Sequence, residues 1–155
     1  MAASPRVGAD APSTASAAGE RPVLLATLDV AFDQAACELA VDAAVESGRG
    51  LLVVVLARLP PLPLSVMLGY DQIVSPEEEA AFRAPAVLAA SLGVEVERLR
   101  VRSPRPVSAL IELAAEREPG LLVFGPDRAL LSGRLYRKAV RALRESSPCL
   151  VWIAP

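Results

Sequence analysis

Residues 121–153 read LLVFGPDRALLSGRLYRKAVRALRESSPCLVWI, and this stretch contains the pattern that decides the fold. The apolar run Leu121–Phe124 predicts a short strand, Gly125 and the residues after it predict a turn, and a basic segment then predicts a helix. Pro148 leads into a second apolar run, 149–153. A buried strand that ends at glycine and feeds a helix N-terminus is where α/β proteins usually bind phosphate or another anion. The stretch therefore predicts an α/β fold and a candidate anion site.

The composition excludes several classes of protein. The chain has 155 residues, of which 53% are hydrophobic and 22% charged, which is typical of one globular domain that buries roughly 70% of its unfolded surface. The net charge of −2 provides no general attraction to nucleic acid or to an anionic membrane. No apolar run approaches the roughly 20 residues that span a bilayer. We therefore expect neither nucleic acid nor membrane as a partner.

The side-chain inventory restricts the chemistry. The chain contains no histidine, which removes His-based general bases and His-ligated metal sites. Its two cysteines, Cys37 and Cys149, lie too far apart in sequence to form a metal-spaced pair. They are most simply small buried side chains in a reducing compartment, so we expect a cytoplasmic protein with no metal site and no catalytic residues.

Strand and helix patterns alternate along the chain. Apolar runs at Val23–Leu28 and 51–57 predict buried strands like the two in the opening stretch. A further strand at 94–101 is interrupted by charged residues, so one of its faces or edges meets water. Helix patterns lie between the strands, one of them starting at Asp33 as N-cap and another at a capping box of Ser75 and Glu78. The order β-α-β-α-β-α-β-α-β predicts a doubly wound parallel sheet with helices on both faces.

The domain boundaries follow from composition. Residues 1–20 are rich in Ala, Ser and Pro and predict a disordered tail, which leaves 21–155 as the folded domain. The proline-rich loop 58–75 is too long for a mere connector and predicts a cover over a site or a partner contact. The last strand has no crossover after it, so it is the best candidate for an apolar edge. We expect a homodimer formed by antiparallel pairing of the segment from Leu150 to Ile153.

The order and spacing of these segments resemble the universal stress protein family over about residues 21–155. The first strand ending in Asp29, the segment 107–114 followed by Leu121 to Gly125, and the closing segment 147–153 are similar to family elements. The resemblance implies a five-stranded sheet in the order 3-2-1-4-5, and it also implies dimerisation through the last strand. That order places the wet strand 94–101 and the last strand at the two edges, in agreement with the edge argument.

The resemblance also implies a ligand site between the first and fourth strands, flanked by Asp29 and Gly125. In ATP-binding members the strand-one aspartate contacts adenosine, and a motif Gly-x2-Gly-x9-Gly-Ser/Thr surrounds the phosphates with backbone N–H groups. This chain has a degenerate form of that motif. Gly125 matches the first glycine, but Arg128, Lys138 and Ala139 stand at the other three positions. A side chain at residue 128 hinders close backbone approach, and the missing hydroxyl removes a phosphate contact.

Basic residues partly offset this loss. Gly133 places a glycine at the start of the last helix, and Arg128 and Arg134 offer positive charge for an anion at the helix N-terminus. A solvated face is the simplest interpretation of the wider basic stripe Arg134, Arg137, Arg141 and Arg144, with Leu135, Ala139 and Leu143 on the buried side. For Arg128 and Arg134, and for Asp29, which can also serve as a turn residue, the ligand role and the structural role both stay open.

Three functions follow from these observations. The resemblance favours a binding or regulatory module that binds an adenine nucleotide, which is ATP in members with the complete family motif. The residues expected to hold the nucleotide are Asp29, Gly125, Arg128, Gly133 and Arg134. A dimeric module that contacts a protein partner and binds no nucleotide is the alternative. A nucleotide hydrolase is the weakest of the three, because no nucleophile–base pair is visible and no complete phosphate loop exists.

Overall fold

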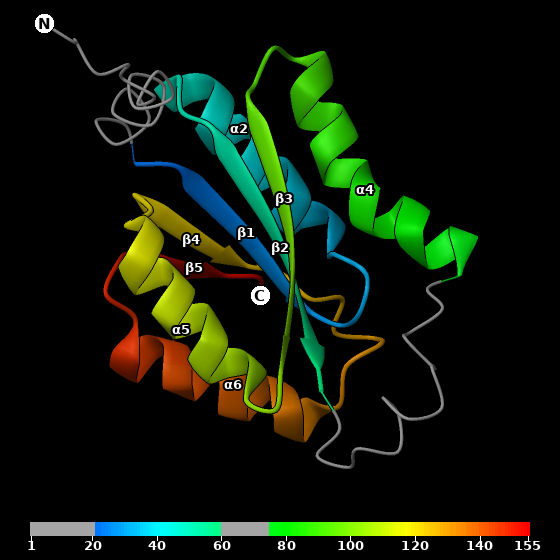
Figure 1. Ribbon diagram of the computed structural model, residues 1–155, viewed down its shortest axis with the longest axis vertical. Coiled ribbons are helices and arrows are strands. Elements are labelled where there is room, and N and C mark those ends of the chain that lie inside the picture. The colour runs from blue at the N-terminus through cyan, green and yellow to red at the C-terminus, as the bar shows by residue number, and fades with distance from the viewer. Residues whose placement is uncertain (1–20, 60–74) are drawn as a thin grey trace, which may run out of the picture.

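Five parallel strands form one sheet in the order β3-β2-β1-β4-β5, and this computed structural model describes residues 21–59 and 75–155 (Figure 1). The order confirms the predicted doubly wound α/β fold. The predicted tail 1–20 and residues 60–74 of the predicted loop 58–75 lie outside the described residues. The elements in chain order are β1 (Val23–Leu28), α2 (Gln34–Ser47), β2 (Leu51–Arg58), α4 (Pro76–Ser91), β3 (Val96–Ser103), α5 (Pro106–Arg117), β4 (Leu121–Phe124), α6 (Gly133–Ser146) and β5 (Val151–Ile153).

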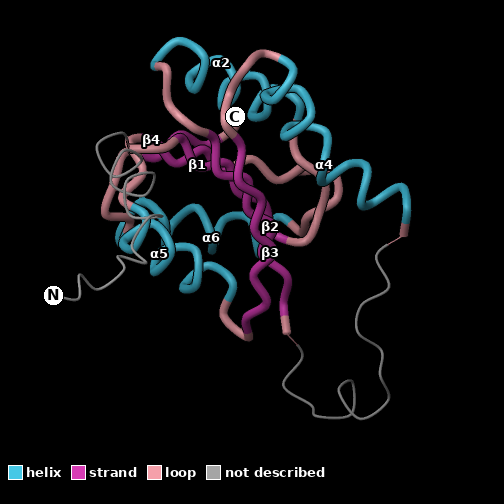
Figure 2. The backbone as a smooth tube through the Cα atoms, turned by 45° about the horizontal axis from the view of Figure 1, so that its top comes forward, coloured by secondary structure: helices cyan, strands magenta, loops and turns pink. Residues whose placement is uncertain are grey.

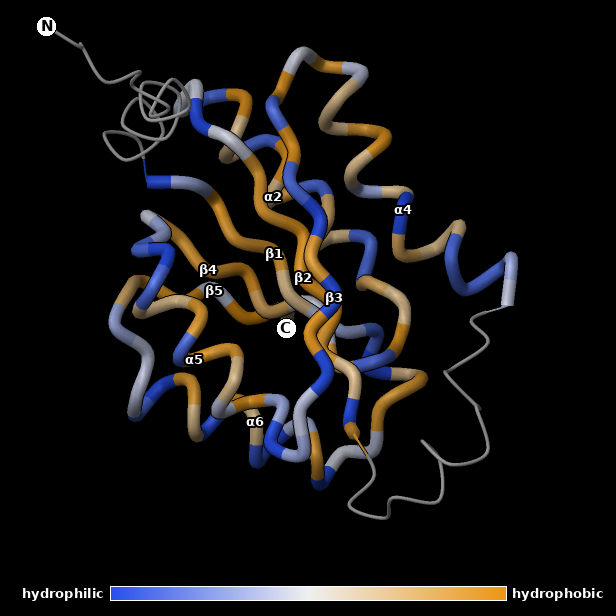
Figure 3. Tube along the Cα trace, in the orientation of Figure 1, coloured by the Kyte–Doolittle hydropathy of each residue, from blue (hydrophilic) through white to orange (hydrophobic). Residues whose placement is uncertain are grey.

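The helices cover both faces of the sheet. Figure 2 shows α2 and α4 on one side of the strands and α5 and α6 on the other. Each layer has its own apolar cluster, one around Val53 beneath α2 and α4, the other around Phe124 beneath α5 and α6. The central strands β1 and β2 are buried along almost their whole length, and Figure 3 shows them among the most hydrophobic segments. Continuous apolar runs are therefore required there, as in other parallel sheets with both faces covered.

The edge strands begin later than predicted. β3 was expected at 94–101 and lies at Val96–Ser103. Its eight residues pair one to one with the eight residues of β2, and this pairing sets both ends of the strand. β5 was expected to start at Cys149 and starts at Val151, because Ser147 Oγ accepts a hydrogen bond from Cys149 N (3.4 Å) and turns the chain first. Both corrections concern where pairing starts, which local composition does not set.

Side-chain caps define the helix ends largely as predicted. Asp33 Oδ2 accepts a hydrogen bond from Ala36 N at 3.0 Å, and the reciprocal capping box of Ser75 and Glu78 begins α4. Ser132 caps α6, so the helix starts at Gly133 as expected. Among the described residues, none of these helices combines the length and apolar character that crossing a membrane requires.

The buried face of α6 differs from the prediction. Leu135 was expected to be buried, but 46% of it is exposed, and Tyr136 takes its place beside Ala139 and Leu143. The Tyr136 hydroxyl donates to the Ala154 carbonyl oxygen at 2.8 Å, and its ring stacks on Phe124. Tyr136 occupies the buried face because its large ring packs in the core while its hydroxyl still forms a hydrogen bond.

The contact between Gly125 and α2 sets the spacing at the end of β4. Gly125 is buried, and a Cβ atom at this position would overlap the Cβ atom of Ala36. Ala36 is fully buried in the first turn of α2. A residue without a side chain is therefore required here by helix packing, before any ligand is considered.

We predict that Gly125→Ala lowers the free energy of unfolding by about 1–3 kcal/mol, since the added methyl group overpacks the α2 contact. Gly133→Ala is the matched control, because its Cβ atom would meet only the tip of Arg137 at 3.4 Å. We expect the control to leave stability unchanged or slightly raised. Urea unfolding curves of both variants provide the measurement, and a Gly125→Ala protein as stable as the wild type would contradict this packing role.

Candidate functional site

The sheet order reverses between β1 and β4, and the predicted site residues lie along this reversal. β1 pairs with β2 on one side and with β4 on the other, so the connections after β1 and β4 leave towards opposite faces. Asp29 follows β1 directly, and Gly125 follows β4. Gly125 N donates to Ala26 O at 2.9 Å, which continues the pairing of the two strands to their ends. Such a reversal is where ligands bind in open α/β sheets.

Backbone hydrogen bonds join the two turns at this point. Asp33 N donates to Gly125 O at 2.9 Å, and Asp127 N donates to Ala31 O at 2.8 Å. Between these bonds Phe32 pairs with Pro126 in an isolated antiparallel bridge. The turns after β1 and β4 therefore form one connected base. A ligand at this position would lie on that base, between the turns and the start of α6.

Asp29 has an unusual backbone conformation. Its φ of +49° lies in the left-handed region, which only a few per cent of non-glycine residues adopt and where Asp and Asn are enriched. Thr27 is fully buried next to it, and Thr27 Oγ1 donates to Val30 O at 2.8 Å, which closes the turn. The turn explains the presence of an aspartate, and it also leaves 51% of the Asp29 side chain exposed.

The Asp29 carboxylate faces β3. Its Oδ1 lies 4.0 Å from Arg100 Nη2, across the end of β2. Partial burial raises the pKa of Asp29 above its ordinary value; the Arg100 guanidinium lowers the pKa by a smaller amount, and Glu78 raises it further. Burial is the dominant cause, since an ion pair at 4.0 Å between partly exposed groups is weak.

The other predicted residues lie in the connection between β4 and α6 and in the first turn of α6. Asp127 Oδ1 accepts a hydrogen bond from Ala129 N at 2.9 Å, which is the turn role expected for this aspartate. The guanidinium of Arg128 lies over the Tyr136 ring, 4.4 Å from its centre. Gly133 and Arg134 are exposed in the first turn of α6. Arg128, Gly133 and Arg134 therefore lie along one loop and the start of a fourteen-residue helix.

The structure thus brings three of the predicted residues together and adds one that was not predicted. Arg128, Gly133 and Arg134 lie at the start of α6. Gly125 begins the connection that leads to this helix, and its backbone is hydrogen-bonded to β1. The Asp29 carboxylate points instead to Arg100, whose role the sequence did not reveal. The available signal was the alternation of Arg98 and Arg100, which places both on one face of β3, but only the register with β2 shows what that face meets.

The Cys37 thiol has a structural role. Burial raises the pKa of the Cys37 thiol to about 12, with smaller contributions from Asp33 and Glu38, so the reactive thiolate is scarce at neutral pH. Within residues 21–59 and 75–155, no cluster of three or more metal-binding side chains is present. We therefore base the function on the junction of the turns after β1 and β4.

Comparisons with known proteins agree with this geometry. The model of the universal stress protein family matches residues 20–155. A search of the curated proteins found no match. Among similar solved structures, a universal stress protein in complex with cAMP is 20% identical, with 87% of this chain and 97% of that chain covered and a TM-score of 0.60. Universal stress protein UspA from Lactobacillus plantarum is 15% identical, with 88% and 99% covered and a TM-score of 0.63.

A third similar structure is the universal stress protein from Archaeoglobus fulgidus in complex with dAMP. It is 18% identical, with 86% of this chain and 96% of that chain covered and a TM-score of 0.52. At these identities the likeness concerns the fold.

The raised pKa of Asp29 leads to a pH-dependent prediction. In the unfolded chain an aspartate ionises near pH 3.9, whereas in the folded protein ionisation is disfavoured, so the ionised carboxylate costs stability as the pH rises above that value. Asparagine cannot ionise and also tolerates positive φ. We expect Asp29→Asn to match the wild-type melting temperature near pH 3.5 and to exceed it, by a few degrees at most, at pH 7.

Thermal melting across this pH range provides the measurement. Asp42→Asn, which removes one exposed carboxylate from α2, controls for the change in net charge. A melting temperature of Asp29→Asn that falls below the wild type as the pH rises would contradict the assignment.

Proposed function

The chain belongs to the universal stress protein family, and on that premise we propose that it is a regulatory module that binds an adenine nucleotide, and not an enzyme. Solved universal stress proteins of the same fold have been obtained in complex with cAMP and with dAMP, and one from Arabidopsis thaliana with AMP. These ligands share an adenine base, a five-carbon sugar and a single phosphate group. They support an adenine nucleotide as the class of ligand for this chain.

One observation carries the proposal: the turns after β1 and β4 are hydrogen-bonded into a single base at the sheet reversal, next to the N-terminus of α6. In the proposed complex Asp29, at the end of β1, contacts the adenosine part. Gly125 leaves room at the base, and Gly133 leaves the first turn of α6 open to the ligand. The amides of that turn and the side chains of Arg128 and Arg134 contact the phosphate.

The substitutions in the glycine motif favour a monophosphate over ATP. Arg128 occupies the position of the second glycine, and Pro126 lacks an N–H group, so few backbone donors remain for a long phosphate chain. Two guanidinium groups beside one helix N-terminus suit a single phosphate. We therefore expect AMP to bind more tightly than ATP.

Isothermal titration with AMP, adenosine and ATP tests this function. We expect Asp29→Ala to weaken AMP and adenosine alike, by about tenfold or more, since a hydrogen bond to a charged group contributes about 1.5–3 kcal/mol. Arg134→Gln should weaken AMP by a similar factor and leave adenosine unchanged, because only the phosphate is affected. Arg141→Gln, on the same helix but two turns further along, is the control and should alter neither.

Two results would contradict the proposal. Absence of heat with any adenine nucleotide favours the alternative, a module that contacts a protein partner. Turnover of nucleotide above a buffer control favours an enzyme.

We also propose that the protein is a homodimer through the segment from Leu150 to Ile153. β5 pairs with β4 on one side and forms an edge of the sheet on the other, and 70% of Leu150 is exposed. Leu122 N donates to Leu150 O at 2.9 Å and Ala154 N to Phe124 O at 3.5 Å. Because alternate residues of a strand direct their backbone groups to opposite sides, Val151 and Ile153 direct theirs to the open edge, where a second β5 can pair.

The dimer is tested by Val151→Pro, which removes an outward N–H group and leaves the bonds to β4 in place. We expect the wild type to be a dimer at micromolar concentration and Val151→Pro to be a folded monomer. Light scattering after size-exclusion chromatography measures the mass, and circular dichroism verifies the fold. A wild-type monomer, or a dimer that survives the substitution, would exclude pairing through β5.

We place the protein in the cytoplasm on the basis of its thiols. Cys37 and Cys149 are both free and partly buried. Free cysteines of this kind are typical of a reducing compartment.

A further inference from the structure

A small cavity lies between α4 and the strands β2 and β3, on the face of the sheet that α2 and α4 cover. Its volume is about 190 Å³, the space of roughly six water molecules. Drug-sized ligands occupy pockets of about 300–1,000 Å³, so a whole nucleotide does not fit. The residues that line it are Val53, Val55, Glu79, Phe82, Arg98, Leu99 and Arg100.

The floor and one wall of the cavity are apolar. Val53 and Val55 belong to the buried face of β2, and Phe82 from α4 is 7% exposed. Val53 also belongs to the apolar cluster beneath α2 and α4. Together these side chains offer a surface for a short or flat apolar group.

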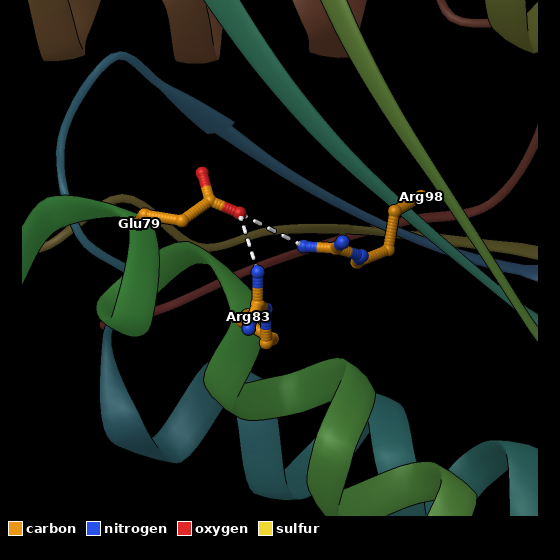
Figure 4. Close-up of polar contacts among 3 residues, drawn as sticks. All are labelled: Glu79, Arg83 and Arg98. Atoms are coloured by element: carbon orange, nitrogen blue, oxygen red, sulfur yellow. Dashed lines mark hydrogen bonds and ion pairs between the residues drawn. The ribbon is translucent and has the colours of Figure 1, made fainter. Parts of the chain in front are cut away.

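Two arginines enter the cavity from β3. Arg98 lies beside Val53 and Arg100 beside Val55 in the parallel register, so both side chains lie on the same face. Arg98 Nη1 contacts Glu79 Oε1 at 3.4 Å, and Glu79 also contacts Arg83 Nη2 at 3.4 Å. Figure 4 shows one oxygen of the Glu79 carboxylate in contact with both guanidinium groups. Glu79 therefore divides its single charge between two arginines.

Arg100 has unused hydrogen-bonding capacity. Its guanidinium lies 5.6 Å from the centre of the Phe82 ring, and its ion pair among the described residues is the 4.0 Å contact with Asp29. Within the described part of the chain, no acceptor forms a hydrogen bond with Arg100. Its side chain is only 28% exposed. A guanidinium carries five N–H donors in a planar fork that matches a carboxylate, so this group is suited to hold an anion.

We propose that this cavity binds a small monocarboxylate with a short or flat apolar body. The carboxylate pairs with Arg100 and is assisted by Arg98, and the apolar body lies on Val53, Val55 and Phe82. The lining carries two positive charges against one negative charge, which favours an anion over a cation. This proposal does not rest on nucleotide binding, since the cavity lies under α4, whereas the proposed nucleotide site lies at the turns after β1 and β4.

Benzoate is the probe, titrated into isotope-labelled protein and followed by amide chemical shifts. We expect shifts that cluster at the cavity, on β2 near Val53 and Val55, on α4 near Phe82 and on β3. Benzyl alcohol has the same ring without the charge and should bind more weakly. Arg100→Gln should weaken benzoate by about tenfold or more, because a charge-assisted contact is lost. Arg105→Gln, an exposed arginine before α5, is the control and should leave binding unchanged.

Three outcomes would overturn the proposal. The first is absence of shifts at about 10 mM benzoate, where a millimolar site is mostly filled. The second is a cluster of shifts on the turn after Gly125 and the start of α6, which would assign benzoate to the arginines there. The third is unchanged affinity in Arg100→Gln. If that variant does not give the dispersed spectrum of a folded protein, Arg98→Gln serves as the second test, with weaker binding again expected.

Discussion

The close approach of Ala36 to the backbone of Gly125 is the constraint on which the rest of the site depends. Because Gly125 has no side chain, the first turn of α2 packs directly against the end of β4. The residues between β1 and α2 are then near enough to the turn after β4 to exchange backbone hydrogen bonds with it. Two loops that leave the sheet towards opposite faces thus form one hydrogen-bonded base, which lies between Asp29 and the start of α6.

Positive charge lies on both sides of this base although the chain has a net charge of −2. Arg128 and Arg134 lie towards α6, and Arg98 and Arg100 lie on β3 beneath α4. Asp29 lies between the two groups and faces β3. Positive charge is therefore present at two separate places, beside the first turn of α6 and in the cavity under α4.

Local sequence patterns predicted the features that local chemistry decides. Val23–Leu28 and Leu121–Phe124 are continuous apolar runs that only a doubly covered strand accommodates, and their bounds were predicted correctly. Asp33 was predicted to be a helix cap, and its carboxylate does accept a hydrogen bond from the amide three residues later. The sheet order, including the positions of both edges, followed from the alternation of elements, from one polar strand and from the family resemblance. The residues proposed for the site lie at strand and helix ends whose positions the sequence patterns predicted.

Features set by tertiary contacts were not predicted. The ends of β3 depend on its pairing with β2, and the same register places Arg100 beside Asp29. The buried face of α6 is set by the Tyr136 hydroxyl and its distant acceptor at Ala154, which no helical period reveals. The sequence also indicated a phosphate role for Gly125, whereas the contact with Ala36 already requires that glycine.

The most direct test of the central claim, a nucleotide at the junction of the β1 and β4 turns, is to map the amide signals that shift when AMP is added to the labelled protein. We expect the shifts to concentrate in residues 28–33 and 125–135, on both sides of the hydrogen-bonded base, and to spare β3 and α4. Shifts confined to β3 and α4, or none at saturating AMP, would contradict it.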